Sequence, residues 1–210
     1  MQKPYLSVII PVKDEIDLLP LVLIDVDRHL HKINFPAEII VAKSGADLEF
    51  ESTIKKISGA IKNLKYLHAE REEGIAGAIK KAMLLSTGNI RLITEMKNTA
   101  LLDQFKDMIP SFEKGSDLVI GRRVFGVGEA KQVWPTKNRI FDGASNIFVS
   151  SVFFRGLKLK DPLSSFKALT EEAAEKIFSS PKNLSLNFNL EILKLAQKNN
   201  LKISEVSVYM

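Results

Sequence analysis

The sequence predicts a single α/β domain with a mainly parallel central sheet and helices on both faces. Short apolar runs rich in β-branched residues alternate with longer segments of helical periodicity, which is the pattern of βαβ units. A length of 210 residues is enough for one such domain with a large core. There is no repeat, linker or low-complexity segment, so we expect residues 1–210 to form one domain.

Strands are expected where apolar runs are short and end at proline, glycine or polar residues. Leu6 to Val12 is the clearest, with proline near its end. The predicted strands are 6–12, 37–42, 64–68, 90–94 and 117–121, with a last alternating strand at 202–209.

Helices are expected where apolar residues recur at helical spacing. Thr170 is a candidate N-cap, followed by two acidic residues in the first turn. The carboxyl ends of parallel strands meet at one edge, where ligands of such sheets bind. The predicted helices are 17–31, 52–63, 74–86, 101–112, 136–154, 171–178 and 190–197, and the ligand edge gathers 12–15, 42–47, 94–98 and 121–123.

Composition excludes several classes. There are no cysteines, so no disulfide framework and no thiolate metal site can form, which fits a reducing compartment. The three histidines lack metal-ligand spacing, and there is no dinucleotide fingerprint or Walker loop. The first apolar run is too short for a secretory signal, and no run of about 18 apolar residues exists. We therefore expect a cytoplasmic protein.

Positive charge concentrates between Arg122 and Lys160, where eight basic residues face two acidic ones, a local charge of +6 within a chain of +5. Such a field indicates an anionic partner such as phosphate, phospholipid or nucleic acid, or simply a solvated basic face. Residues 140–153 within it carry an amphipathic helical pattern. That helix can lie on a membrane surface or pack in the core, and both interpretations stay open.

Seven segments, in order along the chain, resemble family 2 glycosyltransferases of the GT-A type. The resemblance is to dolichyl-phosphate mannose synthase-like and related polyprenyl-phosphate sugar synthases in particular. The segments are S-V-I-I-P-V-K-D-E from Ser7, E-G-I-A-G-A-I from Glu73 with S-T-G-N-I from Ser86, D-L-V-I-G-R-R from Asp117, W-P at Trp134 with Arg139, D-P-L-S-S-F-K-A from Asp161, F-N-L-E from Phe188, and I-S-E-V from Ile203.

The resemblance implies a Rossmann-like GT-A domain, with a nucleotide half at about 1–123 and an acceptor half at about 124–210. It assigns catalytic roles to Asp161, Arg122 and Arg139. The acceptor phosphate is expected on Arg122, Arg123, Arg139 and Lys167, because guanidinium matches phosphate oxygens. Asp161 is read either as orienting hydroxyls or as capping the turn at Pro162. The residues expected to bind the nucleotide sugar are Pro11, Val12, Asp14, Glu15, Asp47, Gly74, Gly77, Glu95 and Lys97.

The sequence departs from the family where the metal would bind. The D-D-G-S-x-D pattern reads Ala42 to Asp47 here, without its first two carboxylates, and D-x-D reads Glu95-Met96-Lys97. Glu95 is the one metal ligand left, so we expect weak Mg²⁺ or Mn²⁺ binding or none. Lys97 either contacts the diphosphate directly or pairs with Glu95.

Two functions follow from the resemblance. One is transfer of a hexose from a UDP- or GDP-linked sugar to a polyprenyl (dolichyl) phosphate or similar acceptor, in the cytoplasm or peripherally on the inner face of a membrane. The other is a catalytically inactive binding or regulatory protein. The expected partners are the nucleotide sugar and a lipid phosphate or anionic membrane surface, with no nucleic acid. The sequence leaves the oligomeric state open.

Overall fold

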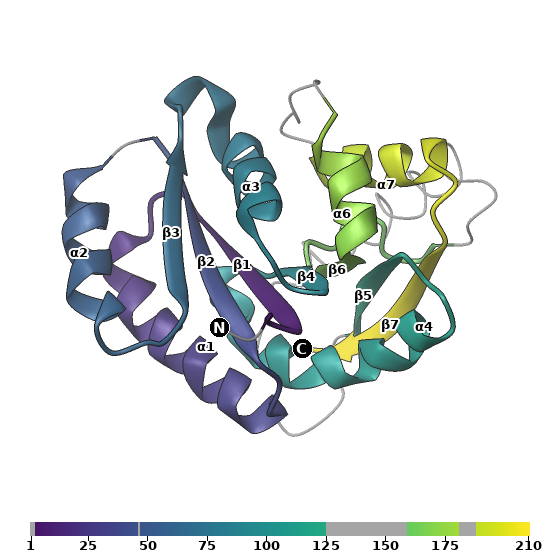
Figure 1. Ribbon diagram of the computed structural model, residues 1–210, viewed down its shortest axis with the longest axis horizontal. Coiled ribbons are helices and arrows are strands. Elements are labelled where there is room, and N and C mark those ends of the chain that lie inside the picture. The colour runs from purple at the N-terminus through teal and green to yellow at the C-terminus, as the bar shows by residue number, and fades with distance from the viewer. Residues whose placement is uncertain (1–2, 46, 125–158, 181–187) are drawn as a thin grey trace.

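The protein, seen here as a computed structural model, is described for residues 3–45, 47–124, 159–180 and 188–210. Its strands form one sheet in the order β3-β2-β1-β4-β6-β5-β7 (Figure 1). β6 runs antiparallel to both of its neighbours, and the other pairs are parallel. The strands are β1 Leu6–Val12, β2 Ala37–Ser44, β3 Leu64–Ala69, β4 Ile90–Ile93, β5 Leu118–Val124, β6 Lys167–Thr170 and β7 Ile203–Tyr209. The predicted mainly parallel α/β fold is confirmed.

Helices cover both faces of the sheet (Figure 1). One face carries α1 Leu19–Ile33, α2 Leu48–Ser58, the 3-10 segment η3 Met96–Met108 and α4 Ile109–Glu113. The other carries α3 Gly74–Leu85, α6 Glu171–Phe178 and α7 Phe188–Lys198. Two short 3-10 turns, η1 Ile16–Leu18 and η2 Arg71–Glu73, lead into α1 and α3.

The alternation of side chains along each strand builds an apolar layer on each face. In β1, Val8 and Ile10 pack beneath α1, whereas Ile9 packs toward α3. In β2, Val41 packs on the α1 side and Ile40 on the α3 side. These side chains of β1 and β2 are all fully buried. Because both faces are covered, these strands read as continuous apolar runs, which is why the sequence locates them.

Three elements differ from the prediction. The helix expected at 52–63 is α2, which begins four residues earlier because the Asp47 side chain caps it, accepting bonds from the amides of Glu49 at 2.9 Å and Phe50 at 3.3 Å. The helix expected at 101–112 is η3 followed by α4. The four-residue strand β6 was not predicted.

The other elements match closely. Thr170 caps α6 as expected, its hydroxyl accepting a bond from the Ala173 amide at 3.2 Å. The helix predicted at 136–154 lies outside the described residues. Among the helices that are described, none has the length and apolar character needed to cross a membrane.

Candidate functional site

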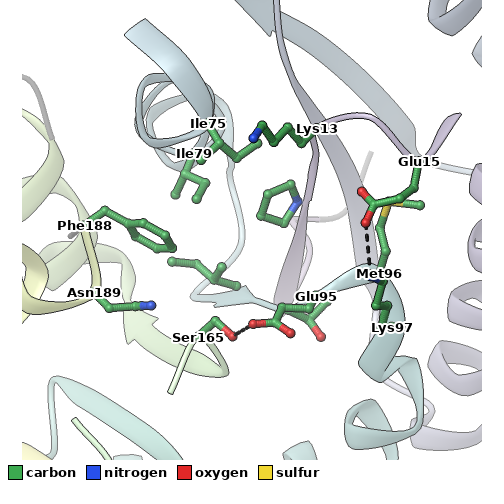
Figure 2. Close-up of a pocket in the computed structure, with 13 residues that line it drawn as sticks. Lys13, Glu15, Ile75, Ile79, Glu95, Met96, Lys97, Ser165, Phe188 and Asn189 are labelled. Carbon is green, nitrogen blue, oxygen red and sulfur yellow. Dashed lines mark hydrogen bonds and ion pairs between the residues drawn. The ribbon is translucent and has the colours of Figure 1, made fainter. Parts of the chain in front are cut away.

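The strand order reverses between β1 and β4, and two adjoining pockets open at the carboxyl ends of the strands there. The central pocket, of about 280 Å³, lies between β1, β4 and α7 (Figure 2). The rim pocket, of about 400 Å³, lies beyond the ends of β2 and β3. Lys13 and Ile75 line both pockets. The central pocket is lined by Pro11, Lys13, Glu15, Ile75, Ile79, Ile93, Thr94, Glu95, Met96, Lys97, Ser165, Phe188 and Asn189.

Glu95 lies at the floor of the central pocket, just after β4. One carboxylate oxygen accepts a hydrogen bond from the Ser165 hydroxyl (Figure 2). The other accepts one from the Asn98 side-chain amide at 3.0 Å. The buried Thr94 hydroxyl beside it has no hydrogen-bond partner among the described residues. Neutral donors therefore already engage both oxygens of the carboxylate that the sequence offers as a metal ligand.

Lys97 pairs with Glu15 across the pocket mouth and not with Glu95. Its ammonium nitrogen lies 3.3 Å from a Glu15 carboxylate oxygen, and the two side chains are 73% and 41% exposed (Figure 2). The interpretation that Lys97 pairs with Glu95 is thus wrong. Glu15 enters the pocket from the turn after β1, on the side from which Lys97 can reach it.

The described residues do not fit a Mg²⁺ or Mn²⁺ ion. No group of three or more histidine, aspartate or glutamate side chains that could hold a metal occurs in the described ranges. Glu15 and Glu95 are the carboxylates that line the central pocket within those ranges. One is paired with an ammonium group and the other is engaged by two neutral donors. A divalent ion held by one or two carboxylates and the diphosphate would have to displace these partners first.

The rim pocket carries lysine where the family pattern has a carboxylate. Lys43 is buried at 6% exposure, donates to the Lys13 carbonyl at 2.6 Å and lies 3.8 Å from an Asp47 carboxylate oxygen. The Asp47 side chain also caps the N-terminus of α2. Gly74, with φ of +61°, opens α3 at the same pocket. The rim pocket is lined by Lys13, Asp14, Lys43, Ser44, Gly45, Asp47, Arg71, Gly74 and Ile75.

Two residues expected at the nucleotide lie outside both pockets. Val12 is fully buried in the layer beneath α1. Gly77 is buried inside α3, where an added Cβ would meet the Glu73 Cβ at 2.4 Å. Close packing accounts for the glycine at this position.

Asp161, which is buried, pairs with the half-buried Arg123. One Asp161 oxygen accepts bonds from the Arg123 amide at 3.1 Å and Nε at 2.8 Å, and the other accepts a bond from the Arg123 guanidinium at 2.9 Å. Asp161 is only 4% exposed, and its carbonyl also accepts the Ser164 amide at 3.1 Å. Its side chain holds β5 against the loop after 160. Neither residue lines the two pockets.

The remaining acceptor residues are dispersed. Arg122 donates to the Ser207 hydroxyl at 2.7 Å across the β5–β7 pair. Arg139 lies outside the described residues. Lys167, expected on the acceptor phosphate, has no exposed surface. Its amine donates to the carbonyls of Pro162 at 3.2 Å and of Ser164 and to the Asn189 side-chain oxygen at 3.1 Å, so it is not placed to meet a phosphate.

Burial lowers the pKa of Lys167 to about 7, because an ammonium loses its hydration there. The nearby carboxylates of Asp161, Glu205 and Glu95 raise that pKa, and the Arg123 guanidinium lowers it. A lysine whose charge changes near neutral pH thus lies directly behind the central pocket.

Several residues that line the central pocket were not among the predicted site residues. Lys13, Ser165, Phe188 and Asn189 all fall within segments that resemble the family. Ser165 and Asn189 come from elements far along the chain, which β6 and α7 bring to the ends of β1 and β4. Their place in the matching segments was the available signal.

Comparison with known proteins agrees with this arrangement. Residues 7–178 match the family model described as Glycosyl transferase family 2. The chain is 31% identical to the dolichyl-phosphate beta-glucosyltransferase of Dictyostelium discoideum, over 97% of this chain and 65% of that protein. It is 23% identical to the dolichol-phosphate mannosyltransferase of Pyrococcus furiosus, over 89% of this chain and 51% of that protein. The chain thus spans less than two thirds of these curated relatives.

Solved structures confirm the GT-A fold. Glucosyl-3-phosphoglycerate synthase from Mycobacterium tuberculosis superposes with a TM-score of 0.63 at 15% identity, covering 99% of this chain and 71% of that one. The same enzyme in complex with Mn²⁺, UDP-glucose and phosphoglyceric acid gives a TM-score of 0.61. At this identity the likeness concerns the fold.

Proposed function

Because the chain belongs to glycosyl transferase family 2, we propose that it transfers a hexose from a nucleoside diphosphate sugar to a polyprenyl phosphate such as dolichyl phosphate. One observation carries the proposal: the central pocket opens where the strand order reverses, between β1 and β4. Open α/β sheets bind nucleotides at this switch point. The curated relatives named above act on dolichyl phosphate.

The two pockets suit the two parts of the donor. We place the nucleoside in the rim pocket and the diphosphate and sugar in the central pocket, with Lys13 between them. The side chains of Lys13 and Lys97 bring positive charge toward the diphosphate, which is where charge develops as it leaves. No step is assigned to a metal, because the described residues do not fit one.

The reaction requires little acid–base catalysis from the protein. An oxygen of the acceptor phosphate attacks the anomeric carbon, a new carbon–oxygen bond forms, and the bond to the diphosphate breaks. The acceptor phosphate is already ionised at neutral pH, so no strong general base is required. Alignment of the acceptor with the anomeric carbon supplies much of the rate.

The acceptor site is assigned to a segment of the chain. We place the lipid phosphate near the basic stretch from Arg122 to Lys160, on the acceptor half at about 124–210, with Asp161 holding Arg123 in place. We propose that the protein works in the cytoplasm or peripherally at the inner face of a membrane. The relatives reported above are named as transferases, and none supports an inactive binding protein.

The test is a transfer assay with radiolabelled UDP-glucose, GDP-mannose and a dTDP-sugar, each with dolichyl phosphate in vesicles. UDP-glucose comes first, because the 31% identical relative is a glucosyltransferase. We expect label in the organic phase and its loss in Lys13→Met, with Lys176→Met on the exposed side of α6 as the matched control. Binding of a nucleotide sugar without any transfer would instead favour the inactive alternative.

A further inference from the structure

Lys167 is fully buried between β6 and α7. It begins β6, and its side chain lies on the same face as Leu169, the face that α3, α6 and α7 cover. A lysine without exposed surface is unusual unless its amine is fully hydrogen-bonded. Here three acceptors surround it: the carbonyls of Pro162 and Ser164 and the side-chain oxygen of Asn189.

These acceptors belong to two separate segments that build one wall of the central pocket. Pro162 and Ser164 lie in the loop that also carries Ser165, whose hydroxyl donates a hydrogen bond to Glu95. Asn189, the second residue of α7, lines the same pocket and donates to the Leu163 carbonyl at 3.2 Å. The amine of Lys167 therefore ties the loop to α7 directly behind the residues that a ligand would meet.

We propose that Lys167 is a positioning residue for the donor: from behind the wall it holds Ser165 and Asn189 in the geometry that the central pocket needs. It touches no substrate itself. The inference rests on the proposed function only in taking the occupant of the pocket to be a nucleoside diphosphate sugar.

The number of protons on the amine matters to this role. An ammonium has three N–H donors and meets three acceptors, whereas a neutral amine has two N–H donors and leaves one acceptor unserved. Asn189 Oδ1 is the acceptor that can turn away, because the other two are backbone carbonyls. The amine stays buried when Asn189 turns away. Within the folded protein, protonation of Lys167 therefore favours the arrangement in which Asn189 is bonded to the amine, which we call the latched wall.

Burial brings the pKa of Lys167 to about 7, against the raising effect of Asp161, Glu205 and Glu95. The Arg123 guanidinium acts in the same direction as burial. The latch therefore changes its bonding around neutral pH, and a donor that binds the latched wall takes up a proton. Donor affinity should fall as the pH rises through this range.

The first measurement is calorimetric titration of UDP-glucose between pH 6 and pH 9. Lys167→Met should lower the affinity at pH 6 by about tenfold to a hundredfold, the worth of a hydrogen bond to a charged group. Lys167→Arg stays protonated and should keep the affinity with a flat pH profile. Lys176→Met, an exposed lysine of α6, is the control and should match the wild type.

The second measurement does not need a ligand. The side-chain amide NMR signal of Asn189, assigned by its loss in Asn189→Leu, should titrate with a midpoint near pH 7 in the wild type. It should stay fixed in Lys167→Arg. The double variant Lys167→Met with Asn189→Leu should cost less affinity than the sum of the two single variants, since both remove the bond between the Lys167 amine and Asn189 Oδ1.

The outcomes separate the latch from the proposed function. If the Asn189 signal does not move between pH 6 and 9, or moves equally in Lys167→Arg, the latch is refuted whatever the protein binds. If Lys167→Met does not fold, the pH dependence of the Asn189 signal in the wild type and the UDP-glucose affinity of Asn189→Leu still test the latch. If the wild type binds no UDP-glucose while the signal titrates as expected, the latch stands and the proposed donor fails.

Discussion

Replacing Lys97 by aspartate should convert a metal-poor site into one that binds Mn²⁺. Lys97→Asp restores a second carboxylate two residues after Glu95, which is the D-x-D spacing, and removes the ammonium that lies 3.3 Å from Glu15. An ion held between Glu15 and Glu95 in the wild type would sit about 2 Å from a carboxylate oxygen. It would then lie within a few ångströms of the Lys97 charge.

The size of the effect follows from that geometry. At about 4 Å a divalent and a monovalent cation repel by about 8 kcal/mol at an effective dielectric of 20, and by about 2 kcal/mol in water. Lys97 is 73% exposed, so water screens its charge and the side chain can swing aside. The lower figure applies, which is roughly thirtyfold in affinity. The second carboxylate of the variant adds to that gain.

The assay is calorimetric titration of MnCl₂ into the protein with UDP present. We expect no micromolar Mn²⁺ binding by the wild type and at least a roughly thirtyfold gain in Lys97→Asp. Lys106→Asp makes the same charge change at an exposed position further along η3 and should gain nothing. Micromolar Mn²⁺ binding by the wild type would refute the reasoning. If UDP binds but neither protein binds Mn²⁺, the missing carboxylates at Ala42 and Lys43 are the cause.

Four further predictions concern stability and membranes. Lys167 has a pKa of about 7 in the folded protein, below its value in the unfolded chain, so the unfolded chain binds more protons above pH 7. In urea unfolding, the free energy of unfolding should therefore rise from pH 7 to 10 by up to about 1.4 kcal/mol per pH unit. Lys167→Met should lose this dependence on pH. Burial raises the pKa of Glu38, but hydrogen bonds from Lys65, Ser7 and Thr87 lower it overall. The stability that the Glu38 carboxylate contributes should therefore be lost as the pH falls through its folded pKa. Glu38→Gln should lower the free energy of unfolding by about 1–3 kcal/mol at pH 7 and should weaken the loss of stability in acid. In Gly88→Ala the new Cβ would meet the Ser7 hydroxyl oxygen at 2.5 Å and the Ser7 backbone nitrogen at 2.7 Å, so chemical denaturation should show a loss of about 1–3 kcal/mol. The basic stretch from Arg122 to Lys160 should bind anionic vesicles weakly and release them at high salt, and equal sedimentation with neutral vesicles would contradict this.

The sequence located most of the sheet because buried parallel strands are continuous apolar runs. β1 and β7 lie within one residue of their predicted bounds. β6 escaped because it has four residues and begins with a buried lysine, which no apolar pattern reveals. α2 begins four residues before the predicted helix, because Asp47 caps it. A short polar residue before an apolar periodic segment can cap a helix or bind a ligand, and sequence does not decide between them.

The candidate site was predictable where it lies at strand ends. Pro11, Glu15, Glu95 and Lys97 do line one pocket, since the carboxyl ends of β1 and β4 share an edge. The partner of Lys97 was not predictable. Glu95 is the extended N-cap of η3 and Lys97 lies in its first turn, and Lys97 reaches Glu15 in a turn about eighty residues earlier in the chain.

The charges around the two pockets indicate how a site of this kind can work without a metal. Two positions where the family pattern has carboxylates are lysines here, and each such exchange shifts the local charge by two units. The exchange at Lys43 is stabilised locally by the Lys13 carbonyl and by Asp47, and the one at Lys97 by Glu15. A divalent ion would bring the same positive charge to the diphosphate that one exchange already supplies. We infer that lysine side chains supply positive charge near the diphosphate in the described pockets. The basic side chains that line the two pockets are Lys13, Lys43, Arg71 and Lys97, and the carboxylates that balance them are Asp14, Glu15, Asp47 and Glu95.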